Sequence, residues 1–218
     1  MRPRAELTAA ELAAVDEASR VLARGAVVAY PTETVYGLAV DARSAAAVAR
    51  LVAMKGRDEG RGISLVVAGL DDAAPLLASP PPGEARALAA RFWPGPLTIV
   101  LPASPSVVPA LRGPSGGVGL RCSSDPFAAA LAARFGAAIT STSANRSGEE
   151  AARSAVEVRS AFAREIARGE LFVLDGGERR SSEASTVLEF SGDRATLRRA
   201  GAIDAAALRT VVDLPEEP

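Results

Sequence analysis

The sequence predicts a single α/β domain with a twisted, mixed β-sheet and flanking helices. The 218 residues are 48% hydrophobic and 23% charged, with a formal net charge of -1, which fits one globular domain that can bury a core. Strand-length apolar runs alternate with helix-length segments along most of the chain, which favours parallel pairs, while closely spaced strands near the C-terminus favour antiparallel ones. We place the domain at residues 1–210 and expect a disordered tail over 211–218.

The first third of the chain is predicted to alternate helix and strand. A Thr/Glu pair with capping-box spacing begins a helix over 8–24, and a glycine ends it. A short apolar run predicts a strand over 26–30, and a serine N-cap begins a helix over 44–54. The run ISLVVA predicts a buried strand over 63–68, and a charged, glycine-rich loop over 57–62 precedes it.

The middle of the chain continues this pattern. Helices are predicted over 71–78 and 83–92, with a proline-rich turn between them. Strands are predicted over 97–101 and 118–121. An aspartate N-cap followed by proline begins a helix that ends near residue 136.

The last third combines two helices with several short strands. A second capping box begins a helix over 154–168, and a final helix begins at Asp204. The predicted strands here are 137–141, 171–174, 186–190 and 195–198.

The composition excludes several kinds of site. Because the chain has no histidine, Ser/His/Asp triads, Cys/His dyads and histidine-containing zinc sites are impossible. The single cysteine, Cys122, excludes a disulfide framework and fits a reducing compartment. No apolar run approaches the roughly 20 residues of a membrane span, and the N-terminal residues carry charges where a signal peptide is apolar. We expect a cytoplasmic protein without membrane contact.

Lysine occurs only once among the basic residues. Of 25 Lys and Arg residues only Lys55 is lysine, which suggests that this position needs a compact ammonium group, chance survival being the alternative. Lys55 and Arg57 form a KGR segment in which two cations can converge on phosphate oxygens, although such a pair is often only a solvated helix end.

Three further segments are rich in hydroxyls, glycine or charge. PTETVYGLAVDA, residues 31–42, follows a strand and is interpreted as a loop with exposed hydroxyls. STSANRSG, residues 141–148, offers uncharged donors, or forms an ordinary Ser/Thr turn. EASTV and LRRAGAI contain Ser185 and Arg199 and are weaker signals. Neither a P-loop nor a GxGxxG fingerprint is present, so any nucleotide is bound by another route.

Taken together, PTETVYGL, KGR, FWPGPLTIVL, VGLR and STSAN resemble the YrdC/Sua5 family in order and spacing, from about Val21 to Ile203. The resemblance implies a large basic cavity and L-threonylcarbamoyladenylate synthase activity. In that reaction L-threonine, bicarbonate or carbon dioxide, and ATP with Mg²⁺ give threonylcarbamoyl-AMP and pyrophosphate. The product serves the tRNA threonylcarbamoyladenosine modification, through downstream transferase proteins. The length resembles the short YrdC type.

The resemblance also implies roles for individual residues. Those implied to face ATP, and to carry the catalysis, are Lys55, Arg57, Ser143 and Asn145, with Arg199 as a further ATP contact. Those implied to bind L-threonine are Thr32, Ser64, Arg121, Ser141 and Ser185, with Arg121 suited to the carboxylate. The chemistry needs orientation and charge neutralisation more than a histidine base.

Two departures from the family pattern leave other readings open. Asp58 and Ala200 stand where the family often has proline, and Asp58 lies in a loop, 57–62, that we expect to close over the site as a lid. One alternative is a protein that binds double-stranded RNA or matures ribosomes without synthase activity, although near-neutral charge argues against strong RNA affinity. A paralogue that has lost activity is a third reading.

Overall fold

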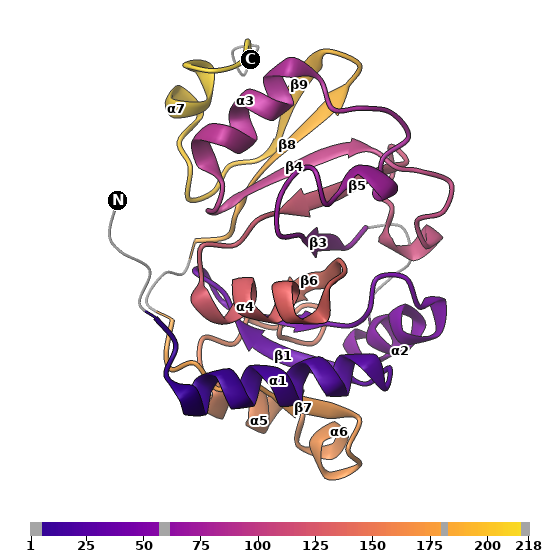
Figure 1. Cartoon of the computed structure of the whole chain (residues 1–218), viewed down its shortest axis with the longest axis vertical. Coiled ribbons are helices and arrows are strands. Elements are labelled where there is room, and N and C mark those ends of the chain that lie inside the picture. The colour runs from indigo at the N-terminus through magenta and orange to yellow at the C-terminus, as the bar shows by residue number, and fades with distance from the viewer. Residues whose placement is uncertain (1–5, 57–61, 180–182, 215–218) are drawn as a thin grey trace.

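The protein folds around one nine-stranded sheet in the part of the chain that the structure, a computed structural model, describes: residues 6–56, 62–179 and 183–214 (Figure 1). The strand order is β7-β1-β2-β6-β3-β5-β4-β8-β9. The strands are β1 (Val27–Pro31), β2 (Tyr36–Ala39), β3 (Ser64–Val66), β4 (Leu97–Pro102), β5 (Gly117–Arg121), β6 (Ile139–Ser143), β7 (Leu171–Val173), β8 (Thr186–Ser191) and β9 (Arg194–Arg199). The helices are α1 (Ala9–Ala23), α2 (Ala45–Lys55), α3 (Gly83–Phe92), α4 (Pro126–Phe135), α5 (Ala155–Ala161), α6 (Ala163–Ala167) and α7 (Ala205–Arg209), with 3₁₀ turns η1 (Ala74–Leu76) and η2 (Pro109–Leu111).

The sheet is mixed, which confirms the predicted fold class. Pairs β1–β7, β3–β5 and β4–β8 are parallel, whereas β1–β2, β2–β6, β3–β6, β4–β5 and β8–β9 are antiparallel. The register places Ser64 opposite Ser141, and Gly37 opposite Ser143, so hydroxyl-bearing residues from distant segments meet on neighbouring strands.

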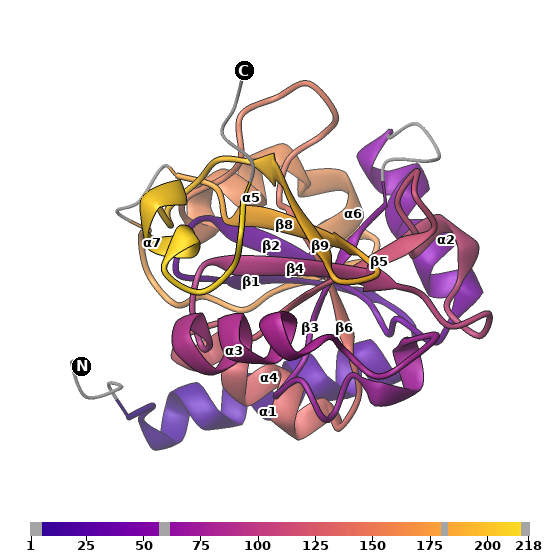
Figure 2. The same cartoon turned by 90° about the horizontal axis from the view of Figure 1, so that it is seen from above.

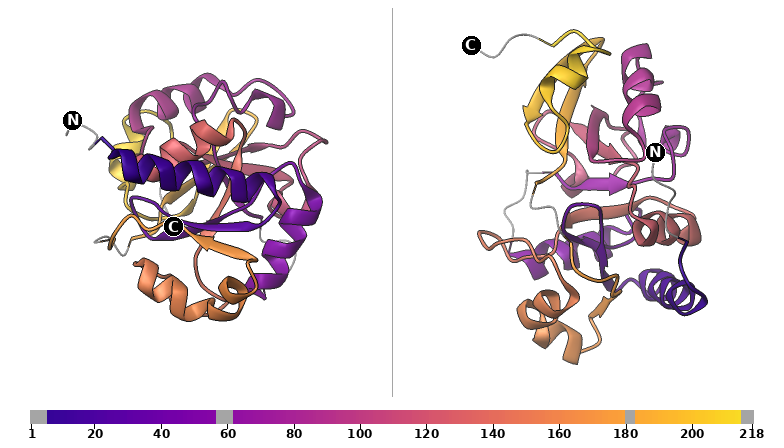
Figure 3. Two further views of the ribbon diagram at one scale, coloured as in Figure 1. Left: turned by 60° about the horizontal axis from the view of Figure 1, so that its bottom comes forward. Right: turned by 90° about the vertical axis from the view of Figure 1, so that its left-hand side faces the viewer.

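Helices cover the sheet, and the sheet separates two hydrophobic clusters. Helices α1 and α4 lie side by side along the lower half of the sheet in Figure 1, and they pack on β1 through Val15, Leu131 and Val28. Helices α5 and α6 lie against β7, and α3 lies against β4 (Figures 2 and 3). The larger cluster contains residues of α2, α3 and α5 with the inner face of the strands.

The predicted elements differ from the structure in four places. The segment 31–42, predicted as a loop, contains β2, whose four residues are all buried. The predicted helix over 71–78 was wrong: only the 3₁₀ turn η1 forms, because Pro75 has no N–H and its ring obstructs a continuing helix. The predicted helix over 154–168 is divided at the fully buried Phe162, whose backbone leaves helical values. Strand β6 lies two residues after the predicted 137–141.

Part of the segment 211–218 belongs to the core. In the segment 211–218, for which we expected disorder, the structure describes 211–214, and Val212 and Leu214 there are buried in the core. The remaining four residues lie outside the described part of the chain. None of the helices that could be described has the length and apolar character needed to cross a bilayer.

Candidate active site

A cavity of about 770 Å³ lies over the middle of the sheet. Its walls come from the β1–β2 loop, the end of β6, and one face of β5, β4 and β8. Because side chains alternate across a strand, residues 117, 119 and 121 of β5 present the same face to this cavity. Eight of the ten residues expected in the site line it: Thr32, Ser64, Arg121, Ser141, Ser143, Asn145, Ser185 and Arg199. Arg57 lies outside the described residues, as does nearly all of the expected lid.

Two glycines of β5, Gly117 and Gly119, keep the space at the bottom of the cavity open. A Cβ on Gly119 would lie 2.9 Å from Ser64 Oγ and 3.2 Å from Thr98 Cγ2, and a Cβ on Gly117 would lie 2.7 Å from Val100 Cγ1. Side chains at these two positions would therefore displace the hydroxyl of Ser64 and fill the space over β5.

Arg121 lies at the end of β5 and is buried, with 6% of its surface exposed. Its Nη2 lies 2.9 Å from Glu33 Oε2 in an ion pair, while Nε is buried without a hydrogen bond among the described residues. The guanidinium thus retains a donor that the described part of the chain does not use. An anionic group in the cavity is the partner that such a fork fits best.

Glu33 is held by three residues that are close together in sequence: Arg121, Ser123 and Ser124. Besides Arg121, it accepts hydrogen bonds from Ser123 Oγ at 2.5 Å and from Ser124 N at 3.3 Å. Burial acts to raise the pKa of Glu33, but the charge of Arg121 and the Ser123 hydrogen bond outweigh it, so the pKa lies below its ordinary value. Glu33 is therefore ionised at neutral pH, and it joins the Thr32–Thr34 loop to the end of β5.

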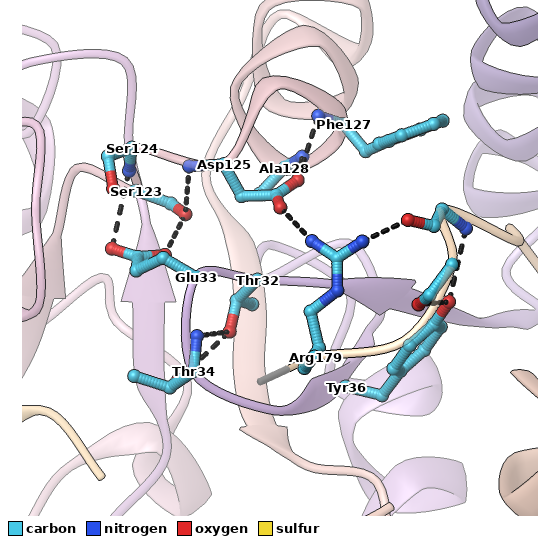
Figure 4. A network of polar contacts seen from close by, with 12 residues as sticks. Thr32, Glu33, Thr34, Tyr36, Ser123, Ser124, Asp125, Phe127, Ala128 and Arg179 are labelled. Carbon is cyan, nitrogen blue, oxygen red and sulfur yellow. Dashed lines mark hydrogen bonds and ion pairs between the residues drawn. The ribbon is translucent and has the colours of Figure 1, made fainter. Parts of the chain in front are cut away.

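A second buried ion pair, between Asp125 and Arg179, lies beside Glu33 (Figure 4). Asp125 caps α4 by accepting from Phe127 N and Ala128 N, and its other oxygen accepts from Arg179 Nη1. Arg179 also donates to the carbonyl of Gly176. Burial raises the pKa of Asp125, and the charge of Arg179 opposes that rise.

Tyr36 also holds the segment of Gly176 and Gly177 that Arg179 contacts. Its hydroxyl donates to Gly177 O at 3.0 Å and accepts from Gly176 N at 3.1 Å. The connection between β7 and β8 is thus held at 176–179 before it reaches Ser185. Glu33 and Arg179 were not predicted from the sequence. The signal for Glu33 was a charged residue between two threonines, and Arg179 had no local signal.

Arg199, the last residue of β9, also lines the cavity. It donates to Ser185 O from Nε at 3.0 Å and from Nη2 at 2.8 Å, and Nη2 also lies 3.0 Å from Ser185 Oγ. Ser185 Oγ in turn lies 3.0 Å from Thr98 Oγ1. Burial lowers the pKa of Arg199, and the charge of Arg121 lowers it further, so the two guanidinium groups act on each other across the cavity.

Lys55 is not a wall of the cavity; it is buried behind the turn that carries Ser143 and Asn145. Its Nζ donates to Ser143 O at 2.5 Å, to Asn145 O at 2.8 Å and to Asn145 Oδ1 at 3.2 Å. Ser143 and Asn145 are therefore brought into the site as predicted, and Lys55 is in direct contact with both.

The charged residues along the cavity wall are Arg121, Arg198, Arg199, Glu149 and Glu189. Glu189 accepts from Arg198 Nε at 2.5 Å. The described residues contain no group of three or more acidic, histidine or cysteine side chains that could hold a metal alone. The arginines of this wall suit an anionic ligand.

Comparison with known proteins identifies the family. A model of the Sua5/YciO/YrdC family, described as "Telomere recombination", matches residues 20–201. The chain belongs to this family. Two relatives carry the name threonylcarbamoyl-AMP synthase: one from Chromohalobacter salexigens, 39% identical over 185 residues, and one from Halorhodospira halophila, 46% identical over 152 residues. The matches cover 85% and 70% of this chain, and 96% and 79% of those proteins.

A solved family structure has the same fold. The crystal structure of P. abyssi Sua5 complexed with L-threonine is 34% identical, with a TM-score of 0.83, and the match covers 92% of this chain. This chain spans 58% of that Sua5 chain.

Proposed function

We propose that this protein is an L-threonylcarbamoyladenylate synthase, which joins L-threonine, carbon dioxide or bicarbonate, and ATP to give threonylcarbamoyl-AMP and pyrophosphate. The observation that carries the proposal is one cavity lined by eight of the residues that the family motifs single out, with the guanidinium groups of Arg121 and Arg199 among them. The name of its relatives supports it. The product is then consumed by downstream transferase proteins in the threonylcarbamoyladenosine modification of tRNA.

The side of the cavity with Arg121 is assigned to L-threonine. The guanidinium of Arg121 binds the carboxylate, and the hydroxyls of Thr32, Ser64 and Ser141 hold the remaining polar atoms. Ser185, which the resemblance also assigns to L-threonine, contacts Arg199 and is assigned to the place where the two substrates meet. Ser64 and Ser141 are register partners on β3 and β6, so their spacing is set by the sheet rather than by a loop.

The triphosphate is assigned to Ser143, Asn145 and Arg199, with Lys55 behind the turn and Arg57 placed there by the resemblance alone. The neutral amine of threonine attacks carbon dioxide and loses a proton, which gives a carbamate. A carbamate oxygen then attacks the α-phosphorus in line, and the bond to pyrophosphate breaks. The protein supplies orientation and cationic groups, which is the main requirement of phosphoryl chemistry.

Magnesium is assigned to enter with ATP. Glu149 is the cavity-lining carboxylate whose backbone oxygen accepts from Asn145 Nδ2 at 2.7 Å, so it lies beside the proposed phosphate end. When bound, Mg²⁺ neutralises part of the triphosphate charge. A cytoplasmic location belongs to the same proposal and is supported by the single cysteine.

The test is pyrophosphate release by the purified protein with Mg-ATP, with L-threonine or bicarbonate omitted in turn. We expect release only when both are present. Release from ATP alone would indicate a different reaction, and no release from protein shown to be folded would exclude synthase activity. No observation on the described residues favours RNA binding; salt-sensitive binding of double-stranded RNA by an inactive protein would favour that alternative.

A further inference from the structure

The carboxylate of Glu33 lies behind the wall of the cavity rather than on it. Among the described residues, Thr32, Thr34 and Arg121 line the cavity, and Glu33 does not. Its side chain is 16% exposed and is directed at residues 123–124, in the link between β5 and α4 (Figure 4). A ligand in the cavity therefore meets Arg121, and Glu33 acts on that ligand only through its neighbours.

Both oxygen atoms of Glu33 are held by groups of the protein. Oε2 pairs with Arg121 Nη2 at 2.9 Å and accepts from Ser123 Oγ at 2.5 Å, while Oε1 accepts from Ser124 N at 3.3 Å. Ser123 Oγ also accepts from the backbone N of Asp125, the N-cap of α4, at 3.2 Å. A carboxylate held at both oxygens keeps one orientation, and it imposes that orientation on the guanidinium with which it pairs.

The guanidinium of Arg121 has a donor left for a ligand. Glu33 lies at Nη2, whereas Nε is buried and makes no hydrogen bond to the described residues. The donors of a guanidinium are fixed in one plane, so a contact that holds one nitrogen sets the direction in which the others donate. Without Glu33 the side chain retains its charge but is free to rotate between staggered torsions. The orientation of the free donor is therefore what Glu33 supplies.

The loop that carries Glu33 keeps its shape by bonds that do not involve the carboxylate. Thr32 Oγ1 donates to Val35 O at 2.7 Å and lies 3.0 Å from Thr34 Oγ1. Thr34 N donates to Thr32 Oγ1 at 3.2 Å. A substitution that changes only the carboxylate thus leaves the Thr32 hydroxyl in place, and its effect on the cavity falls on Arg121.

We propose that Glu33 is a positioning residue for the amino-acid substrate: it orients the guanidinium of Arg121 toward the substrate carboxylate and does not touch the substrate itself. It follows that Glu33 governs recognition of the carboxylate and not of the amine or the hydroxyl. The identity of the substrate as L-threonine rests on the proposed function. The orientation of Arg121 does not, because it is a property of the ligand-free protein.

The first test observes the guanidinium of Arg121 in ligand-free protein by NMR of its side-chain nitrogens. A guanidinium held by an ion pair rotates slowly, and its two Nη atoms then give separate signals; those of Arg121 are the ones missing from Arg121→Lys. We expect Glu33→Gln to accelerate this rotation by about tenfold or more, because the charge that holds Nη2 is lost. Arg179, which pairs with Asp125, is the internal reference and keeps its rate. Unchanged rotation of Arg121 in Glu33→Gln would overturn the proposal.

The second test compares two ligands by calorimetry, L-threonine and L-threoninamide, which differ only in that the second has a neutral amide in place of the carboxylate. We expect Glu33→Gln to raise the Kd for L-threonine by about fivefold or more and to change the Kd for L-threoninamide by less than about twofold. Glu17→Gln removes a carboxylate that pairs with Arg20 on the surface of α1, and it leaves both values unchanged. Equal losses for the two ligands would show that Glu33 supports the whole site and would overturn the proposal, as would an unchanged Kd for L-threonine.

A second variant keeps the proposal testable if Glu33→Gln does not fold. Ser123→Ala removes one hydrogen bond to Glu33 and leaves both charges of the ion pair, so we expect the rotation rate of Arg121 and the Kd for L-threonine each to rise by about threefold. Unchanged values in both measurements would contradict the proposal. A wild-type protein that binds neither ligand would refute the proposed function at this site, and the NMR comparison would still decide whether Glu33 orients Arg121.

Discussion

The two sides of the cavity stabilise their cations in different ways. On one side, which we call the ion-paired side, Arg121 pairs with Glu33 and Arg179 pairs with Asp125. On the other, which we call the neutral side after Arg199 itself, Arg199 donates to oxygens of Ser185 and forms no ion pair with a described carboxylate, although its neighbour Arg198 pairs with Glu189. Arg121 is buried and has its charge offset by Glu33, whereas Arg199 is exposed and forms no ion pair with a described carboxylate.

This difference matches the charges of the two proposed substrates. A compensated arginine is held in one orientation and adds little net potential, which suits the single carboxylate of an amino acid. An arginine without a counter-ion leaves positive potential for a polyanion, and its lowered pKa reflects burial together with the neighbouring charge of Arg121. In this proposal Arg121 binds the amino-acid carboxylate mainly through hydrogen-bond geometry, and Arg199 attracts the polyanion mainly through its charge.

The largest expected effect is on stability, at the ion-paired side. Arg179→Met leaves Asp125, 4% exposed, as a buried carboxylate without its cation. Breaking a buried pair in this way costs about 3–5 kcal/mol, so we expect the free energy of unfolding in urea at pH 7 to fall by about 3 kcal/mol. The loss shrinks at acidic pH, because protonation of Asp125 removes the unpaired charge.

A matched variant supplies the control for this prediction. Arg20 pairs with Glu17 on the surface of α1, where its side chain is 63% exposed. Arg20→Met is expected to change the free energy of unfolding by less than about 1 kcal/mol. Equal losses in the two variants would mean that the buried pair contributes no more than a surface one, and the contrast between the two sides would lose its energetic basis.

The next effect is on substrate affinity, and it compares the two arginines directly. Arg121→Lys keeps the charge beside Glu33 but loses the planar fork, so we expect KM for L-threonine to rise about tenfold and KM for ATP to change less than about threefold. Arg199→Lys keeps the charge that matters on the neutral side and is expected to leave KM for ATP within about threefold. Arg199→Gln removes that charge, and KM for ATP is expected to rise about tenfold.

Steady-state kinetics with each substrate varied in turn measure these values. An Arg199→Lys variant as impaired as Arg199→Gln would show that geometry, and not charge, governs the neutral side as well. The two sides would then follow the same principle.

Local sequence signals predicted much of this architecture. Capping residues at Thr8, Ser44, Asp125 and Ser154 begin helices α1, α2, α4 and α5, because a cap acts on the backbone within three residues. Strand β2 was missed since its four residues lie between hydroxyl-rich segments and become a strand only by pairing with β1 and β6. Tertiary pairing of this kind has no local signature.

The site shows the same division between local and distant information. Sequence motifs pointed to Ser143 and Asn145, and Lys55 was noticed because it is the only lysine in the chain. The partners of these residues depend on how α2 and β6 meet in space. Arg179 could not be identified, since in a chain with 24 arginines nothing local distinguishes the one that reaches Asp125, 54 residues away in sequence. Position in the fold, rather than residue type, gives it a role.

The smallest expected effect is on pH dependence, and it tests whether Glu33 stabilises the ion-paired side by its charge. The pKa of Glu33 in the folded protein lies below its ordinary value of about 4.3, so its contribution to stability is present above that value and is lost as the pH falls through the folded pKa. We therefore expect wild type to exceed Glu33→Gln in free energy of unfolding by a constant amount from pH 7 to about pH 5.5, and by a decreasing amount below about pH 4. A difference that persists undiminished in acid would show that the carboxylate acts through its shape and its bonds to Ser123 and Ser124, which glutamine reproduces incompletely, and not through its charge opposite Arg121.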